Sequence, residues 1–216
     1  MSEAALRQAQ QIVRVVAQTA VDNEKYFCEL DAVVGDGDFG YSLARGFEVV
    51  LSDWDAMEYS DVAGLLKKTA MVLSKRIGGT SGPIWGTAFL RAGGALNDVA
   101  EPSGEQVIAA LRAAIEGIKQ RGSANVGDKT LLDALVPAVD ELESALPAGA
   151  GPAIERAAAT ARTSAEATNG MLAQRGRASY TGERSRDSAD AGAIAVAVMF
   201  EAVSKAVRAA GPETAQ

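Results

Sequence analysis

The stretch "SGEQVIAALRAAIEGIKQRG", residues 103–122, decides the fold class of this chain. Ser103 followed three residues later by Gln106 forms a capping box, in which the two side chains satisfy backbone N–H groups at the start of a helix. Apolar residues then recur every three or four positions: Ile108, Leu111, Ile115 and Ile118. This spacing places them on one face of an α-helix, so the stretch predicts a capped amphipathic helix.

The same helical period continues through most of the chain, and strand-like alternation is hard to find. It is clear in two sets near the N-terminus: Leu6, Ala9, Val13, Val16 and Ala20, then Val62, Leu65, Leu66, Thr69 and Leu73. The alanine-rich segment 152–171 buries much surface only if it approaches a neighbouring helix closely, and residues 193–209 predict a last, apolar helix. We therefore predict an all-α architecture of roughly eight helices.

One further helix is expected after residue 127, and glycines mark the joints between helices. Asp128 is a candidate cap for this helix, and Pro137 should kink it unless its first turn starts late. The glycines fall into four groups: Gly35, Gly37 and Gly40; Gly78, Gly79 and Gly82; Gly122 and Gly127; Gly176, Gly182 and Gly192. Short connections at one end of a bundle would bring these four joints together.

Length and composition limit the class of protein. A chain of 216 residues fits one domain, taken here as residues 1–216. With 28 acidic and 21 basic residues the net charge is −7, which argues against nucleic acid or an anionic membrane as partner. The single cysteine, Cys28, permits no intramolecular disulfide and reads as a small apolar filler on a helix face. With no leader and no membrane-length apolar run, a cytoplasmic location is expected.

The chain contains no histidine, which removes the commonest general base and metal ligand. Carboxylates are the alternative, and the stretch "LDAVVGDGDFGYSLARGFE", residues 30–48, crowds Asp31, Asp36 and Asp38 among glycines. Carboxylates this close repel each other unless a cation or several N–H donors absorb the charge, and Mg²⁺ shared with nucleotide phosphates fits such a turn. The alternative is a helix cap at Asp38 and a turn at Asp36. A calcium EF-hand fails, because its required glycine and glutamate are absent.

Three other stretches offer phosphate-binding chemistry. The segment 122–130, "GSANVGDKT", resembles a P-loop but inserts Asp128 before Lys129 and lacks the preceding strand, so we reject a P-loop and keep Gly122 as a nucleotide contact. The segment 78–87, "GGTSGPIWGT", offers backbone N–H groups and hydroxyls before a helix, and is equally a tight turn. The segment 175–193 carries four arginines, which can clamp phosphate or form a solvated basic loop.

Together these stretches resemble the nucleotide-binding L subunit (DhaL) of dihydroxyacetone kinases. The segments "GDGDFG", "GGTSGP" with "GTAFLRAG", "RGSANVGDKTLLDALVPA" and "GRASYTGERS" follow the order and spacing of that family over nearly the whole chain. The resemblance implies an antiparallel eight-helix barrel with a nucleotide, ADP or ATP, held at one end through two Mg²⁺ ions.

The resemblance also implies roles for single residues. Asp31, Asp36 and Asp38 correspond to the metal-binding aspartates of the family. The implied nucleotide contacts are Phe39, Gly40, Ser42, Gly79, Thr80, Ser81, Gly122, Leu131, Arg177, Asp190 and Gly192. No catalytic side chain is implied, since transfer would be positional and electrostatic. The chain departs from the family pattern at Phe39, Ser42 and Ala191, where relatives commonly carry histidine, asparagine and proline.

The implied reaction is phosphoryl transfer to a short-chain ketose, either dihydroxyacetone or a four-carbon ketose. Kinases of this family hold the ketose on a histidine of another domain or subunit, so we expect a separate substrate-binding subunit. The donor is ATP, or ADP recharged by a phosphohistidine carrier. A nucleotide-sensing regulatory module and a metal-dependent phosphohydrolase remain alternatives.

Overall fold

The computed structural model describes residues 3–210, and these are all-helical, with no strand among them. The α-helices are α1 (Glu3–Asp22), α2 (Glu24–Ala32), α3 (Phe39–Ser52), α4 (Val62–Arg76), α5 (Ser81–Ala95), α6 (Gly104–Gly122), α7 (Leu132–Ala145), α8 (Ala150–Ala167) and α9 (Ala191–Ala209). Three 3₁₀ segments join them: η1 (Trp54–Ala56), η2 (Leu146–Ala148) and η3 (Arg177–Asp187). The predicted all-α class is confirmed.

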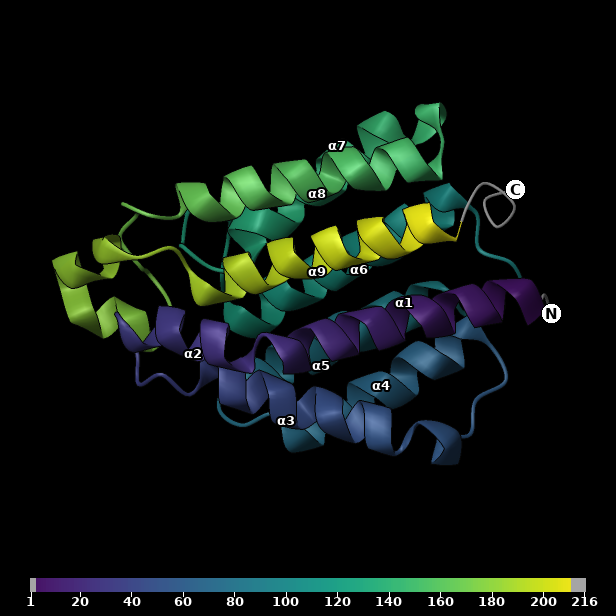
Figure 1. The fold of residues 1–216 in the computed structure, drawn as a ribbon, viewed down its shortest axis with the longest axis horizontal. Helices are drawn as coiled ribbons and strands as arrows, with labels where there is room; N and C mark the ends of the chain where they lie inside the picture. The colour runs from purple at the N-terminus through teal and green to yellow at the C-terminus, as the bar shows by residue number, and fades with distance from the viewer. Residues whose placement is uncertain (1–2, 211–216) are drawn as a thin grey trace.

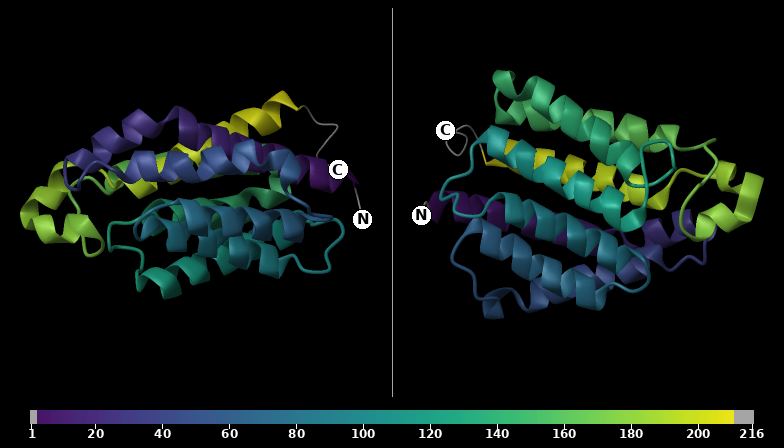
Figure 2. Two further views of the ribbon diagram at one scale, coloured as in Figure 1. Left: turned by 90° about the horizontal axis from the view of Figure 1, so that it is seen from below. Right: turned by 180° about the vertical axis from the view of Figure 1, so that it is seen from behind.

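The long helices, α1 and α3 to α9, run back and forth along the molecule and close into a barrel (Figures 1 and 2). Each packs on its neighbours in the order α1, α3, α4, α5, α6, α7, α8, α9, and α9 returns to α1. The short helix α2 continues α1 beyond Asn23 and packs on α3. The predicted eight-helix barrel is therefore confirmed, with α2 as a ninth, shorter helix among the described residues.

The barrel interior is filled by apolar side chains from all these helices. Phe27, Leu43, Phe47 and Leu65 are fully buried, and the Phe47 ring packs edge-on against Trp85 with ring centroids 6.4 Å apart. Burial of each such side chain contributes about 1.5–3 kcal/mol. The core thus fixes the helices that carry the end loops.

Alanine governs the packing of α8, as its composition predicts. Its buried residues are all alanines: Ala153, Ala157, Ala158, Ala161 and Ala165. Small side chains let α8 lie close against α7 and α9, and Arg162 adds a bidentate pair to Glu201 of α9 at 2.8 and 2.9 Å. The expectation of close helix-to-helix approach in this segment is confirmed.

Gly40 and Gly86 are two of the glycines that permit close helix contacts. A Cβ on Gly40 would lie 2.1 Å from the carbonyl oxygen of Glu24, so α3 can approach α2 only without a side chain there. A Cβ on Gly86 would lie 3.1 Å from the carbonyl oxygen of Ala70, where α5 crosses α4. Gly40 therefore positions the first turn of α3 directly against α2.

The helix starts agree with the sequence at α6 but not at α7. Ser103 and Gln106 form the predicted capping box. The predicted cap at Asp128 is wrong, because α7 begins at Leu132 and Asp133 accepts from the N–H of Thr130 at 2.7 Å. Pro137 lies inside α7, which begins at Leu132 and continues to Ala145. The helix therefore does not start late enough to place Pro137 in its first turn.

Among residues 3–210, no helix combines the length and hydropathy needed to cross a bilayer.

Candidate functional site

The four glycine joints lie at one end of the barrel, where the loops before α3, α5, α7 and α9 meet (Figure 1). Glycines of three joints lie close to a neighbouring segment at this end, as shown by the distance from a Cβ built on each glycine. This distance is 3.6 Å from Gly78 to Ser42 Oγ, 3.2 Å from Gly122 to Ile84 Cδ1 and 3.4 Å from Gly192 to Leu131 Cβ. The loops thus surround a common end, as the sequence predicted. We call it the site end.

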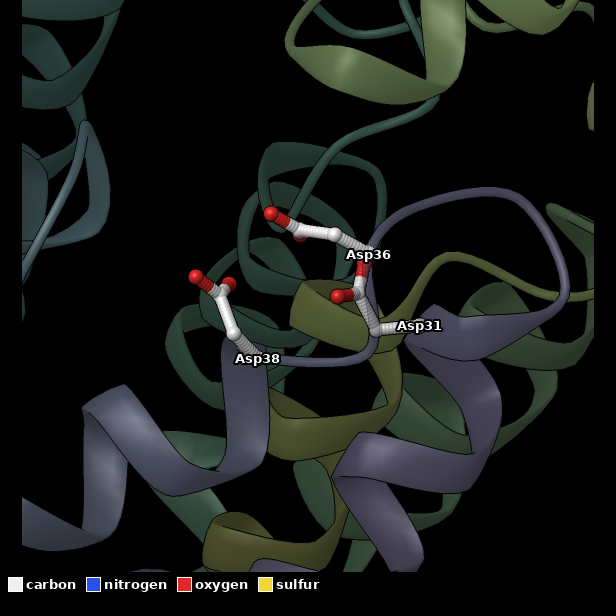
Figure 3. Close-up of side chains that lie close together, drawn as sticks. All are labelled: Asp31, Asp36 and Asp38. Carbon is white, nitrogen blue, oxygen red and sulfur yellow. The ribbon is translucent and has the colours of Figure 1, made fainter.

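Three carboxylates converge at the site end (Figure 3). Asp31 lies in the last turn of α2, Asp36 in the following loop and Asp38 directly before α3. One oxygen from each lies within 4.8 Å of the others. Gly37, with φ +74°, provides the left-handed backbone between Asp36 and Asp38. We call these three residues the aspartate cluster.

Backbone contacts fix the aspartate cluster on α2 and α3. The Asp31 carbonyl accepts from the N–H of Gly35 at 2.6 Å, and the Asp31 carboxylate accepts from the N–H of Phe39 at 3.3 Å. The Phe39 ring packs against Phe27, with centroids 6.2 Å apart. Asp38 occupies the N-cap position of α3 but makes no capping bond with its side chain. Simple capping therefore does not account for Asp38.

The electrostatics of the cluster favour a bound cation. Burial, followed by the charges of Asp36 and Asp31, raises the pKa of the Asp38 carboxyl above its usual range, while Arg177 opposes this shift. Arg177 Nη1 lies 3.0 Å from Asp36 Oδ2. One arginine beside three carboxylates leaves the cluster with a negative charge that a cation would neutralise.

The donor set fits Mg²⁺. Oxygen ligands of one Mg²⁺ lie about 2.0–2.1 Å from the ion, so two of them are at most about 4.2 Å apart. The spacing of up to 4.8 Å in the cluster exceeds this limit only slightly. The exposed Asp36 and Asp38 can turn by that amount. Hard carboxylate ligands without nitrogen or sulfur also suit this ion.

The four arginines near the site end are engaged in contacts. Arg175 pairs with Asp128 at 3.0 Å, and the Arg186 guanidinium donates to the carbonyl of Gly170 at 2.6 Å. Arg177 and Arg184 reach the loop of the aspartate cluster, Arg184 through the carbonyl of Val33 at 3.4 Å. The segment is therefore more than a solvated basic loop.

Asp190 and Gly192 begin α9 at the same end. The Asp190 side chain accepts from the N–H of Ala193 at 2.7 Å and caps the helix. Burial raises the pKa of the Asp190 carboxyl to about 7, and the nearby Asp133 charge adds to the rise. Lys129 and the bond from Ala193 act in the opposite direction. A cap that titrates near neutral pH is unusual for an aspartate.

The remaining predicted contacts lie on the loops around the cluster. Gly79 has φ +62°, and the exposed Thr80 precedes α5, which begins at Ser81. The Thr80 side chain makes no capping bond, so its hydroxyl is not used in that way. The structure thus places every predicted site residue at the site end. Their assignment to a nucleotide stays a prediction.

Lys129 is a residue whose role the sequence missed. Its side chain is 2% exposed and its ammonium donates to three main-chain carbonyls, those of Met171, Ser185 and Ser188. A lysine held in this way does not reach phosphates, which agrees with the rejection of a P-loop. No local signal could reveal these partners, which lie 42 to 59 residues away in the chain.

Fold and site together define an all-helical barrel with a carboxylate cluster suited to a cation at one end. Comparison with known proteins gives the family: residues 33–205 match the DAK2 domain, and the chain belongs to this family. The predicted relation to DhaL is confirmed.

The similar proteins include both short subunits and longer kinases. The chain is 36% identical over 186 residues to the Escherichia coli PEP-dependent dihydroxyacetone kinase, ADP-binding subunit DhaL, covering 85% of this chain and 89% of that one. It is 37% identical to the L-erythrulose 1-kinase of Mycolicibacterium smegmatis, covering 94% of this chain but 36% of that protein. These relatives are kinases by name, as the sequence predicted.

Solved structures show the same fold. The dihydroxyacetone kinase of C. freundii superposes with a TM-score of 0.74 at 29% identity, covering 92% of this chain and 34% of that one. Its complex with AMP-PNP and Mg²⁺ superposes with a TM-score of 0.72 and the same identity, covering 91% of this chain and 33% of that one. The chain therefore spans about nine tenths of the DhaL subunit and about a third of the longer kinases.

Proposed function

We propose that this chain is the nucleotide-binding, phosphoryl-donor part of a ketose kinase. The observation that carries the proposal is the aspartate cluster at the meeting point of four loops in a DAK2 chain. Relatives of similar length are named as ADP-binding subunits of dihydroxyacetone kinase, and one structural neighbour was solved with AMP-PNP and Mg²⁺.

In this proposal the aspartate cluster holds Mg²⁺, as two ions, against the nucleotide phosphates. Bound Mg²⁺ would neutralise charge on the β- and γ-phosphates during in-line transfer. Arg177 orients Asp36 in the cluster and offers its remaining donors toward phosphate oxygens. Thr80, Ser81 and the first amides of α5 present hydroxyl and N–H donors from the loop that approaches α3 at Ser42.

The acceptor is proposed to be a short-chain ketose held on a separate substrate-binding subunit or domain. The chain contains no histidine, so it cannot itself hold a ketose covalently in the way the family does. Relatives are named for dihydroxyacetone and for erythrulose, which favours a three- or four-carbon ketose. The donor is either exchangeable ATP or ADP recharged by a phosphohistidine carrier, as the PEP- and PTS-dependent names of relatives suggest.

The nucleotide that the protein retains tests the proposal and separates the two donors. The protein is purified with Mg²⁺, desalted, denatured, and the released nucleotide is identified by chromatography. Stoichiometric ADP is the result expected for a recharged coenzyme, and an empty site that then binds added ATP indicates an exchangeable donor. A protein that neither retains nor binds adenine nucleotide contradicts the proposal.

The isolated chain should also leave bound nucleotide intact. Without a substrate-binding subunit, no ketose is positioned to accept the phosphoryl group, so release of inorganic phosphate from Mg²⁺-ATP should stay at the background rate. Rapid phosphate release by the isolated chain would instead support a metal-dependent phosphohydrolase.

A further inference from the structure

The ammonium of Lys129 is buried at the site end and bound only by main-chain carbonyls. It donates to Met171 at 3.3 Å, to Ser188 at 2.6 Å, and to Ser185. Three carbonyls match the three N–H donors of a lysine ammonium. The residue has φ +61°, a left-handed conformation that is uncommon for a side chain of this size. The backbone is therefore held in an unfavoured conformation where this ammonium meets its partners.

The three acceptors lie at the two ends of one segment, residues 171–188, which we call the arginine loop. Two other contacts close the same base: the N–H of Gly170 donates to the main-chain carbonyl of Arg186 at 3.0 Å, and the N–H of Ala173 donates to Ser185 Oγ at 3.0 Å. The loop leaves the barrel after α8 and returns to α9, projecting from the site end (Figure 1). Lys129 thus fastens the base of the arginine loop.

The arginine loop carries the groups that reach the aspartate cluster. Arg177 pairs with Asp36 at 3.0 Å, and Arg184 donates to the carbonyl of Val33 at 3.4 Å. Asp190 follows two residues after Ser188, whose carbonyl Lys129 holds. Each of these contacts depends on where the base of the loop lies.

Among the described residues, no carboxylate oxygen lies within 4.0 Å of the Lys129 ammonium nitrogen to form an ion pair. Burial lowers the pKa of its ammonium, while the charges of Asp190 and Asp187 oppose this shift. Burying a charged group is costly unless hydrogen bonds compensate for the lost water. Because all three compensating bonds go to the arginine loop, removing the ammonium should release this loop rather than the barrel.

We propose that Lys129 is a positioning residue, which fixes the arginine loop so that Arg177 meets Asp36 and thereby raises affinity for Mg²⁺-nucleotide without contacting it. The effect on affinity rests on the proposed function. The effect on the loop does not, and the two are measured separately.

Limited trypsin digestion without nucleotide measures the loop directly, because Arg175, Arg177, Arg184 and Arg186 provide cleavage sites. Cleavage in the loop should be at least about tenfold faster in Lys129→Met than in wild type, since proteolysis follows the population of the open form. Lys68→Met, which changes an exposed lysine of α4, should match wild type. Unchanged cleavage in a folded Lys129→Met variant would overturn the proposal.

A milder variant covers the case in which Lys129→Met fails to fold, as judged by far-ultraviolet circular dichroism. Lys129→Gln keeps two N–H donors on a shorter side chain, so it weakens the bonds to the carbonyls of Met171, Ser185 and Ser188 without placing an apolar group there. It should raise cleavage in the loop severalfold while the rest of the protein digests as wild type. Wild-type cleavage in a folded Lys129→Gln variant would overturn the proposal in that case.

A double-variant cycle tests whether Lys129 acts through the loop. Titration calorimetry gives the Kd of Mg²⁺-ADP for Lys129→Met, Arg177→Ala and the combination. Each single change should weaken binding, and the combination should fall well short of the product of the two fold-changes, because both remove the same contact. A full product would show that Lys129 acts by another route and would overturn the proposal.

The failure of the proposed function is distinguishable from the failure of this inference. If wild type binds no Mg²⁺-ADP, the proposed function fails, while the trypsin rates still decide whether Lys129 positions the loop.

Discussion

Asp190→Asn should remove a pH dependence of stability that Asp190 imposes on the protein. Burial raises the pKa of this carboxyl from its ordinary value of 3.8 to about 7, so the folded state holds a proton that the unfolded chain has lost. The folded state therefore binds more protons between about pH 4 and pH 7, and the free energy of unfolding must fall as pH rises through that range. The contribution of the Asp190 proton to stability is complete below the unfolded pKa of 3.8 and is lost above the folded pKa of about 7.

The size of the effect follows from the two pKa values. One pKa unit corresponds to about 1.4 kcal/mol of unfolding free energy. Between pH 5 and pH 8 the folded state keeps its extra proton only up to about pH 7, so the stability contribution falls by the equivalent of about two pKa units. Asp190 keeps part of its surface exposed, so we expect a fall of about 2 kcal/mol in the free energy of unfolding. Asparagine retains a side-chain oxygen for the N–H of Ala193, so the helix cap should survive the substitution.

Urea unfolding followed by circular dichroism at pH 5 and pH 8, without metal or nucleotide, measures the effect. The free energy of unfolding of wild type should fall by about 2 kcal/mol more than that of Asp190→Asn. Asp55→Asn, which changes an exposed carboxylate of η1 at the other end of the barrel, should behave as wild type. An equal fall in the free energy of unfolding of wild type and Asp190→Asn between pH 5 and pH 8 would show that Asp190 does not cause the pH dependence.

Three further substitutions test the packing of the barrel. Gly40→Ala should destabilise the protein by about 1–3 kcal/mol, because its Cβ would lie 2.1 Å from the Glu24 carbonyl; an unchanged melting temperature would contradict this. Ala161→Leu should cost a similar amount, since α8 has no space at this fully buried position, and normal urea unfolding would argue against close packing. Arg162→Met should lower the free energy of unfolding by about 1–2 kcal/mol, because it leaves Glu201 unpaired. Adding Glu201→Gln should recover part of this stability in urea unfolding, and no recovery would show that loss of the ion pair is not the cause.

The elements that the sequence predicts well are those with local causes. The capping box at Ser103 and Gln106 predicts the start of α6, because both partners lie within one turn. The alanines of segment 152–171 predict close packing, because only small side chains permit it. The glycine joints predict that four loops share one end, since alternate connections of an antiparallel bundle must meet.

The details that the sequence could not predict depend on distant partners. Asp128 is a candidate cap by residue type, but α7 begins only at Leu132, and the loop before it folds onto the Asp133 carboxylate, which accepts from the N–H groups of Gly127 and Thr130. The contact between Arg177 and Asp36 joins residues from opposite parts of the chain, which only the closed barrel brings together. Lys129 is likewise defined by carbonyls of a loop whose path no local pattern specifies.

The proposed Mg²⁺-nucleotide site is tested by the binding of ADP to wild type and to Asp36→Asn, measured by titration calorimetry with Mg²⁺ and with EDTA. Wild type should bind ADP with Mg²⁺ and lose most of that affinity in EDTA. Asp36→Asn should bind at least about tenfold more weakly in Mg²⁺, since loss of outer-shell groups alone has an effect of that size on metal sites. Asp55→Asn serves as the matched control and should bind as wild type.

Stability separates loss of the site from loss of the fold. Asp36→Asn removes one of three like charges and also the exposed ion pair with Arg177, so these small effects oppose each other, and its free energy of unfolding without metal should lie within about 1 kcal/mol of that of wild type. We therefore expect weak Mg²⁺-ADP binding by a fully folded Asp36→Asn variant. Equal ADP affinity in wild type and Asp36→Asn would contradict a Mg²⁺-nucleotide site at the aspartate cluster. The same would follow if wild type bound ADP equally well with Mg²⁺ and with EDTA.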